Sequence, residues 1–111
     1  MKKEYSTIIT TCSDKTSAKK IANLLVENRL VACVQMLPIE SVYLWKNEIC
    51  NENEIVLFMK SKPELFDKIV ATIKENHTYE IPEIIQIPIT NGLSEYLNWI
   101  DDCVEKLEHN K

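Results

Sequence analysis

The sequence contains a single glycine, Gly92, and this count limits what the chain can fold into and do. Phosphate-cradling loops, the dinucleotide-binding turn and the nucleophile elbow of hydrolases need glycines, because their backbones approach a ligand closely or take conformations that a Cβ atom hinders. None of these motifs can be built with one glycine. The usual nucleotide-binding sites and the α/β-hydrolase active site are therefore not expected.

The length and charge of the chain favour one self-sufficient domain. A chain of 111 residues has the usual size of a single domain and buries roughly two-thirds of the surface that it exposes when unfolded. We therefore expect one domain over residues 1–111. The formal net charge is -4 and the lysines are scattered, which argues against a nucleic-acid partner. No apolar run reaches the roughly 18 residues that cross a bilayer, so no membrane partner is expected.

The four cysteines show no spacing typical of a zinc site or a redox motif, because no pair forms C-x-x-C. They are Cys12, Cys33, Cys50 and Cys103. The N-terminal segment has no long apolar core and no small-residue cleavage site, so it is not interpreted as a signal peptide. We therefore expect a cytoplasmic protein with reduced thiols.

Hydrophobic periodicity predicts a mixture of strands and helices. Runs of β-branched and aromatic residues indicate strands, and apolar residues at i, i+3, i+4 and i+7 indicate helices. The predicted strands cover residues 5–12, 30–45, 54–61 and 83–90, and the predicted helices cover 13–29, 61–76 and 93–107. Ser13 or Asp14 is expected to cap the first helix, and "SKPE" at 61–64 matches a capping box for the second.

This order, β-α-β-β-α-β with a terminal helix, predicts an α+β fold, the ferredoxin-like sandwich. Pro38 and Pro88 cannot donate to a ladder, so each is expected at a sheet edge, a bend or a strand end. The strands taken as central are apolar on both faces, at Val31, Cys33, Val42, Leu44, Val56 and Phe58. The second face of the sheet therefore needs a cover. We expect the terminal helix to cover part of it and a neighbouring subunit the rest.

Three segments, in this order and spacing, resemble the CutA family of divalent-cation tolerance proteins. They are "LVACVQMLPIESVYLWKNEI", "HTYEIPEIIQIPI" and "GLSEYLNWI", and the resemblance runs from about Ser6 to Ile100. It implies a ferredoxin-like homotrimer, built like the PII signalling proteins, with sheets packed around a three-fold axis. Two positions depart from the family pattern: Asn47 stands where glycine is usual, and Thr78 where proline is usual.

The resemblance also suggests metal ligands. Cysteines at the positions of Cys12 and Cys33 are implicated in copper binding in some family members, and thiols are soft ligands suited to Cu(I). His77 is the third candidate, because neutral imidazole is a common metal ligand. Each has a structural alternative. The cysteines can be buried thiols without metal, and His77 can end the second helix and bond its last carbonyls.

A second candidate site is a cleft between subunits, which the family lines with a histidine, a tyrosine and a glutamate. The matching residues here are His77, Tyr79 and Glu80, with Glu83 close by in the sequence. Tyr43, Trp45 and Tyr79 are expected either to pack the trimer contact or to wall a pocket in which Lys60 is the cationic group. Both roles are compatible, because pockets often lie at subunit interfaces.

A catalytic function is not favoured. No Ser-His-Asp order surrounds an elbow, and Asp101 and Asp102 are adjacent on a predicted helix and are expected to be solvated. We therefore expect a non-enzymatic trimer that serves divalent-cation tolerance, requires no cofactor and binds metal ions, with copper favoured. The alternatives are a PII-like sensor that binds a small anion or metabolite in the cleft, and a structural scaffold.

Overall fold

The computed structural model describes residues 3–106, which form four strands and three α-helices. In chain order these are β1 (Tyr5–Cys12), α1 (Lys15–Glu27), β2 (Cys33–Trp45), β3 (Glu48–Ser61), a 3-10 turn (Pro63–Leu65), α2 (Phe66–Asn76), β4 (Ile84–Ile89) and α3 (Ser94–Cys103). The predicted α+β class and the predicted order of elements are confirmed. Across the described residues, no helix combines the length and apolar character needed to span a membrane.

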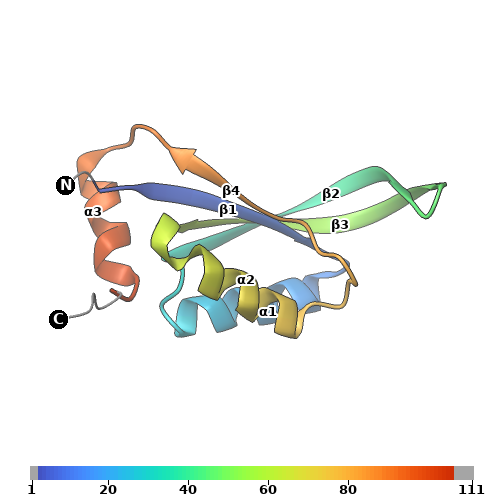
Figure 1. Cartoon of the computed structure of the whole chain (residues 1–111), viewed down its shortest axis with the longest axis horizontal. Coiled ribbons are helices and arrows are strands. Elements are labelled where there is room, and N and C mark those ends of the chain that lie inside the picture. Colours follow the sequence, from blue (N-terminus) through green and yellow to red (C-terminus); the bar gives the residue numbers. More distant parts are fainter. Residues whose placement is uncertain (1–2, 107–111) are drawn as a thin grey trace.

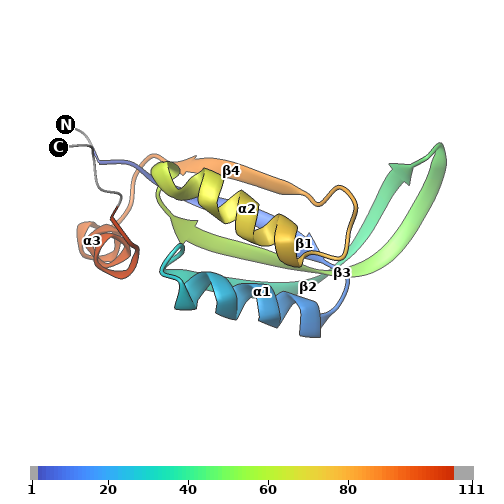
Figure 2. The ribbon, with the colours of Figure 1, turned by 60° about the horizontal axis from the view of Figure 1, so that its bottom comes forward.

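The strands form one antiparallel sheet in the order β2-β3-β1-β4. Helices α1 and α2 lie side by side on one face of this sheet (Figure 1, Figure 2). Pro38 lies in the edge strand β2 and Pro88 in the edge strand β4, as a residue without an N–H donor requires. The prediction that both prolines mark the sheet margin is confirmed.

The core lies between the sheet and the two helices. Every second residue of β1 and β3 faces the helices, so Ile8 pairs with Met59 and both are fully buried. Ile21 and Leu25 of α1, with Ile69 of α2, close the layer from the other side. Burying each such side chain contributes roughly 1.5–3 kcal/mol, so this layer fixes how the sheet and helices sit together.

Strands β2 and β3 form a long hairpin that extends beyond the helices (Figure 2). Trp45 pairs with Glu48, which leaves Lys46 and Asn47 as a two-residue turn with positive φ values of 50° and 67°. Two successive positive φ values suit the right-handed twist of a hairpin, and asparagine tolerates them well. The returning strand was predicted from residue 54 but already begins at Glu48, because residues 48–53 are mostly polar and the apolar Ile49 among them is exposed.

Helix α3 lies across the end of the sandwich farthest from the hairpin turn (Figure 1). Its Ile100 joins the core, as does Val104, the residue that follows the helix. The Tyr96 hydroxyl lies 3.7 Å from Cys33 Sγ, at the margin of the sheet face that α1 and α2 leave uncovered. Farther along that face, Leu37 and Ile87 are exposed. The expectation that α3 covers part of that face is therefore met only at its margin. Leu107, which was expected on the same helix, lies outside the described residues.

Two local predictions were wrong. The "SKPE" capping box does not form, because Ser61 Oγ donates to the carbonyl of Leu30 at 2.6 Å and α2 begins after the 3-10 turn without a side-chain cap. Asp101 is not solvated but only 8% exposed. It lies four residues after Leu97 and so shares the inward face of α3. The predicted cap of α1 is confirmed, since Asp14 Oδ1 accepts from the Ser17 N–H at 2.7 Å.

Candidate functional site

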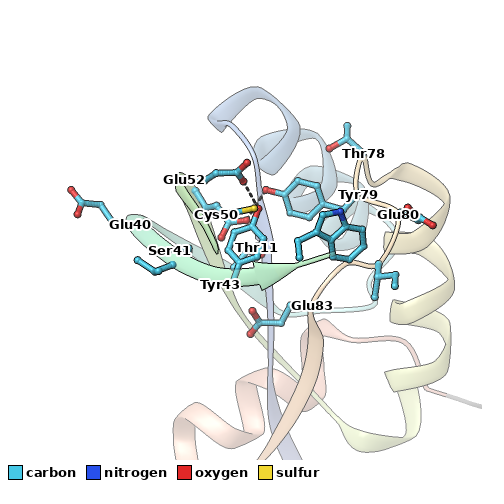
Figure 3. Close-up of a pocket in the computed structure, with 14 residues that line it drawn as sticks. Thr11, Glu40, Ser41, Tyr43, Cys50, Glu52, Thr78, Tyr79, Glu80 and Glu83 are labelled. Carbon is cyan, nitrogen blue, oxygen red and sulfur yellow. Dashed lines mark hydrogen bonds between the residues drawn. The ribbon is translucent and has the colours of Figure 1, made fainter. Parts of the chain in front are cut away.

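A cleft of about 820 Å³ lies between the β2–β3 hairpin and the segment that joins α2 to β4. Figure 3 shows Tyr43 and Tyr79 at the centre of its lining, with Glu40, Glu80 and Glu83 around the margin. The pairing of β2 with β3 builds one wall, because Tyr43 lies opposite Cys50 and next to the pair of Ser41 with Glu52. The other wall comes from residues 78–81 and 83.

Two tyrosine–glutamate hydrogen bonds organise the cleft. The Tyr43 hydroxyl donates to Glu52 Oε1 at 2.7 Å, and the Tyr79 hydroxyl donates to Glu54 Oε2 at 2.6 Å. The hydrogen bond to Glu52 raises the pKa of Tyr43 to about 12. Burial, and then the bond to Glu54, raises the pKa of Tyr79 above its ordinary value. Both phenols therefore stay protonated at neutral pH and keep donating to their carboxylates.

The cleft is acidic. Among residues 3–106, those that line it include five glutamates, at positions 40, 52, 54, 80 and 83, and no lysine, arginine or histidine. Glu54 is only 7% exposed, so its carboxylate is largely withdrawn from water. A concave surface lined by charges of one sign concentrates counter-ions of the other sign. The electrostatics of this cleft therefore favour a cation over an anion.

His77 ends α2, as one of the two sequence interpretations proposed, but its ring bonds a strand rather than the helix. Its Nδ1 accepts the Tyr79 N–H at 3.0 Å, so the proton lies on Nε2, which donates to the Thr11 carbonyl at 2.7 Å. Both ring nitrogens are thus engaged with the backbone. His77 does not line the cleft; it fixes the position of Tyr79, which does.

The structure brings Cys12 to His77 but places Cys33 elsewhere. Cys12 Sγ lies 3.9 Å from His77 Nε2. Burial, followed by the charges of Asp14 and Glu54, raises the pKa of the buried Cys12 thiol to about 11. Cys12 of β1 pairs with Ile55 of β3, and Cys33 of β2 pairs with Lys60 of the same strand β3. Five residues of strand span about 17 Å, and the odd offset puts the two thiols on opposite sheet faces. One chain therefore does not join them at a single ion.

Lys60, the cationic group expected in the cleft, lies away from it. Its Nζ donates to Gln35 Oε1 at 2.9 Å on the uncovered face of the sheet. The other predicted cleft residues do line one cleft, namely Tyr43, Trp45, Tyr79, Glu80 and Glu83. The cleft residues that sequence reasoning missed include Thr11, Glu40, Cys50, Glu52 and Glu54.

The missed glutamates had a recognisable signal. In "EICNENE" the glutamates at 48, 52 and 54 are four and two residues apart, so they share one face of a strand, but the predicted strand began only at residue 54. Across residues 3–106, no three His, Cys, Asp or Glu side chains lie close enough together to hold a metal ion as they stand. A cation in this cleft therefore has to complete its coordination with water.

The fold and the cleft together define a small α+β sandwich that offers oxygen ligands to a cation. A family model described as CutA1 divalent ion tolerance protein matches residues 6–103, and the chain belongs to this family. The divalent-cation tolerance protein CutA of Archaeoglobus fulgidus is 37% identical over 101 residues, which cover 91% of this chain and 99% of that protein. The crystal structure of CutA1 from Oryza sativa superposes with a TM-score of 0.91 at 31% identity, covering 94% of this chain and 96% of that one.

Some relatives are longer. The chloroplastic protein CutA of Arabidopsis thaliana is 36% identical over 94 residues, which cover 84% of this chain and 52% of that protein. The chain thus spans about half the length of this relative. The relatives also differ in compartment, because this one is described as chloroplastic and the A. fulgidus structure is described as that of a periplasmic protein.

Proposed function

We propose that the chain is a non-enzymatic protein of divalent-cation tolerance and that the acidic cleft is its cation-binding site. One observation carries the proposal. Within the part of the chain that the structure describes, the residues that line the cleft include five glutamates and no basic side chain, and two of these glutamates are held in place by tyrosine hydroxyls. The family to which the chain belongs is described by tolerance of divalent ions, which is the chemistry that such a cleft would serve.

The binding should be weak and partly hydrated. Glu40 and Glu80 lie on opposite sides of the cleft in Figure 3, and the carboxylates do not converge on one point. Ions that prefer oxygen ligands often bind through one or two carboxylates and keep several waters. Glu52 and Glu54 share one face of β3, so this pair is the natural anchor for such an ion.

Copper is the ion we propose first, for a reason that does not require thiols. A site of given ligands binds Cu²⁺ more tightly than the other first-row divalent ions, so even a loose carboxylate cleft would favour it. The thiol alternative, with Cys12, Cys33 and His77, has less support within one chain. His77 would have to leave the Thr11 carbonyl, and Cys33 lies on the other face of the sheet.

The PII-like alternative, a sensor for a small anion, has less support in the cleft that one chain forms. The lining residues that the structure describes offer an anion no cationic side chain, and Lys60 is bonded to Gln35 elsewhere. A catalytic role is also disfavoured, because the Cys12 thiol beside His77 has a pKa of about 11 and stays protonated at neutral pH. These observations support a binding protein rather than an enzyme.

We propose further that the chain assembles as a homotrimer of ferredoxin-like units in the cytoplasm. The support is the uncovered sheet face, on which Leu37 is 53% exposed and Ile85 and Ile87 are each 45% exposed. Neighbouring strands place these side chains on one continuous apolar surface. Such a surface is typical of a subunit contact. The four cysteines are free, which suits a reducing compartment.

A melting series separates the three functional alternatives. Zn²⁺ serves as a redox-inert probe for divalent cations, and inorganic phosphate and a dicarboxylate serve as probes for anions. A rise in melting temperature with Zn²⁺ but not with the anions is the result that the cleft predicts, because a ligand stabilises the state that binds it. A rise with an anion alone would favour the sensor, and no shift with any probe would favour the scaffold.

A further inference from the structure

The segment that joins α2 to β4, residues 77–83, is called the strap below. It forms neither helix nor strand, and none of its residues is buried. Within the described chain, no backbone–backbone hydrogen bond outside the regular elements involves these residues. Little apolar burial therefore holds the strap against the rest of the molecule, and its attachment depends on a few side-chain contacts.

Those contacts form one continuous chain from β1 to β3. His77 Nε2 donates to the Thr11 carbonyl at 2.7 Å, and the Tyr79 N–H donates to His77 Nδ1 at 3.0 Å. The two rings lie against each other, with centroids 4.8 Å apart. The Tyr79 hydroxyl then reaches Glu54 Oε2 at 2.6 Å. Tyr79 thus joins the His77 end of the strap to the buried carboxylate on β3.

The strap covers two features. Cys12 is the last residue of β1, and the next two residues are exposed, so its sulfur lies at the edge of the core. The His77 ring lies 3.9 Å from that sulfur, and Cys12 is nevertheless only 1% exposed. The strap also supplies Tyr79, Glu80 and Glu83 to the wall of the cleft.

We propose that the strap is a lid whose latch is the hydrogen bond between Tyr79 and Glu54. Opening the latch exposes the Cys12 thiol and removes one wall of the cleft, while the sheet stays folded. The lid controls access to a thiol, which is a property separate from cation binding. The proposal of a lid therefore holds whether or not the cleft binds a cation. Hydrogen bonds to charged groups are among the stronger ones in proteins, so one such bond can set the opening equilibrium of a weakly packed segment.

The test is the alkylation rate of each cysteine by N-ethylmaleimide at one fixed pH, followed by peptide mass spectrometry. Tyr79→Phe removes the latch and keeps the ring. Tyr43→Phe is the matched control, because it removes the other tyrosine–glutamate bond of the same cleft from β2 rather than from the strap. Tyr79→Phe should speed the alkylation of Cys12 about tenfold or more. Tyr43→Phe should change it by less than about twofold, and the Cys103 rate should not change.

Equal Cys12 rates in the two variants would overturn the proposal. So would a rise in Tyr79→Phe that comes with lost hydrogen-exchange protection across β1 and β3, since that would be global unfolding. The wild-type protein gives an independent check. If the lid opens locally, the Cys12 rate should hardly depend on low urea concentrations. A steep dependence would mean that the thiol is reached only through unfolding of the whole domain, and the lid would be rejected.

Discussion

The ammonium group of Lys62 lies 2.5 Å from Asp101 Oδ1 and ties α3 to the end of the sheet. Tyr5 donates to the other carboxylate oxygen at 2.5 Å. Burial alone would raise the pKa of Asp101, but the bonds from Lys62 and Tyr5 and the charge of Lys62 outweigh it and lower the pKa to about 2. One buried carboxylate thus connects the first strand, the start of the second helical segment and the last helix.

This pKa predicts how stability depends on pH. Asp101 has a folded-state pKa below its ordinary 3.8, so its contribution is fully present above pH 3.8 and is lost as pH falls toward about 2. A shift of this size corresponds to about 2 kcal/mol. Asp101→Asn should therefore lower the free energy of unfolding by about that amount at pH 7, and the difference from wild type should disappear near pH 2. Urea unfolding at several pH values measures this.

The neighbouring residue supplies the control for that series. Asp102 is exposed on the same helix, so Asp102→Asn should leave stability within about 0.5 kcal/mol of wild type at every pH. A loss as large in Asp102→Asn as in Asp101→Asn would mean that general charge on α3, and not the buried contact, stabilises this end of the molecule.

The thiols should differ in reactivity. With a pKa of about 11 in place of 9.0, the thiolate fraction of Cys12 at pH 8 is about 100-fold lower than that of an ordinary cysteine. Cys12 is also buried, whereas Cys33, Cys50 and Cys103 are half-buried, so Cys12 should alkylate markedly more slowly than these three. Its rate should rise about tenfold per pH unit up to pH 11. Equal rates for Cys12 and Cys103 would contradict the buried, protonated thiol.

His77 should act as a structural clamp. His77→Ala removes the donor to the Thr11 carbonyl and the acceptor for the Tyr79 N–H, so we expect it to cost about 1–3 kcal/mol. Thr78→Ala changes an exposed neighbour in the same segment and should be nearly neutral. Thermal unfolding of both variants measures the difference. If His77→Ala were as stable as Thr78→Ala, the two ring hydrogen bonds would contribute little.

The uncovered sheet face predicts an oligomer. Light scattering should give a mass of three times the 12.9 kDa of the chain. Ile87→Lys places a charge on the exposed apolar face and should dissociate the assembly, whereas Val26→Lys, on α1 and away from that face, should not. A stable wild-type monomer at micromolar concentration would show that this face has no cover from copies of the chain.

The sequence determined the elements well where local chemistry decides them. Pro38 and Pro88 marked the edge strands because proline lacks an N–H donor, and Asp14 marked the start of α1 because its carboxylate caps the first turn. The start of β3 was missed because residues 48–53 lie in the projecting hairpin, where most side chains are polar and the apolar Ile49 is exposed rather than buried. Periodicity reports burial, and an unburied strand gives no such signal.

The site could be predicted only in part, for a different reason. The partner of Asp101 is Tyr5, 96 residues away, and the partner of Glu54 is Tyr79, 25 residues away. Such pairs are set by strand register and helix docking, which no local pattern encodes. The separation of Cys12 from Cys33 likewise depends on the register of both strands against β3. The family resemblance indicated the candidate site residues, but not which of them lie in contact.

The central claim is that carboxylates of the cleft, and not thiols, bind the cation. Calorimetric titration with Zn²⁺ under a phosphine reductant tests it in three variants. The double substitution Glu52→Gln with Glu54→Gln keeps acceptors for both tyrosines and removes two charges. Cys12→Ala with Cys33→Ala removes the thiols, and Glu27→Gln changes one exposed carboxylate outside the cleft.

The glutamine pair should weaken Zn²⁺ binding about tenfold or more, because the anchoring charges are lost. The cysteine pair and Glu27→Gln should bind as wild type does. Weakened Zn²⁺ binding in the double cysteine variant, with unchanged binding in the double glutamine variant, would contradict the account. The cation would then bind at Cys12 and Cys33.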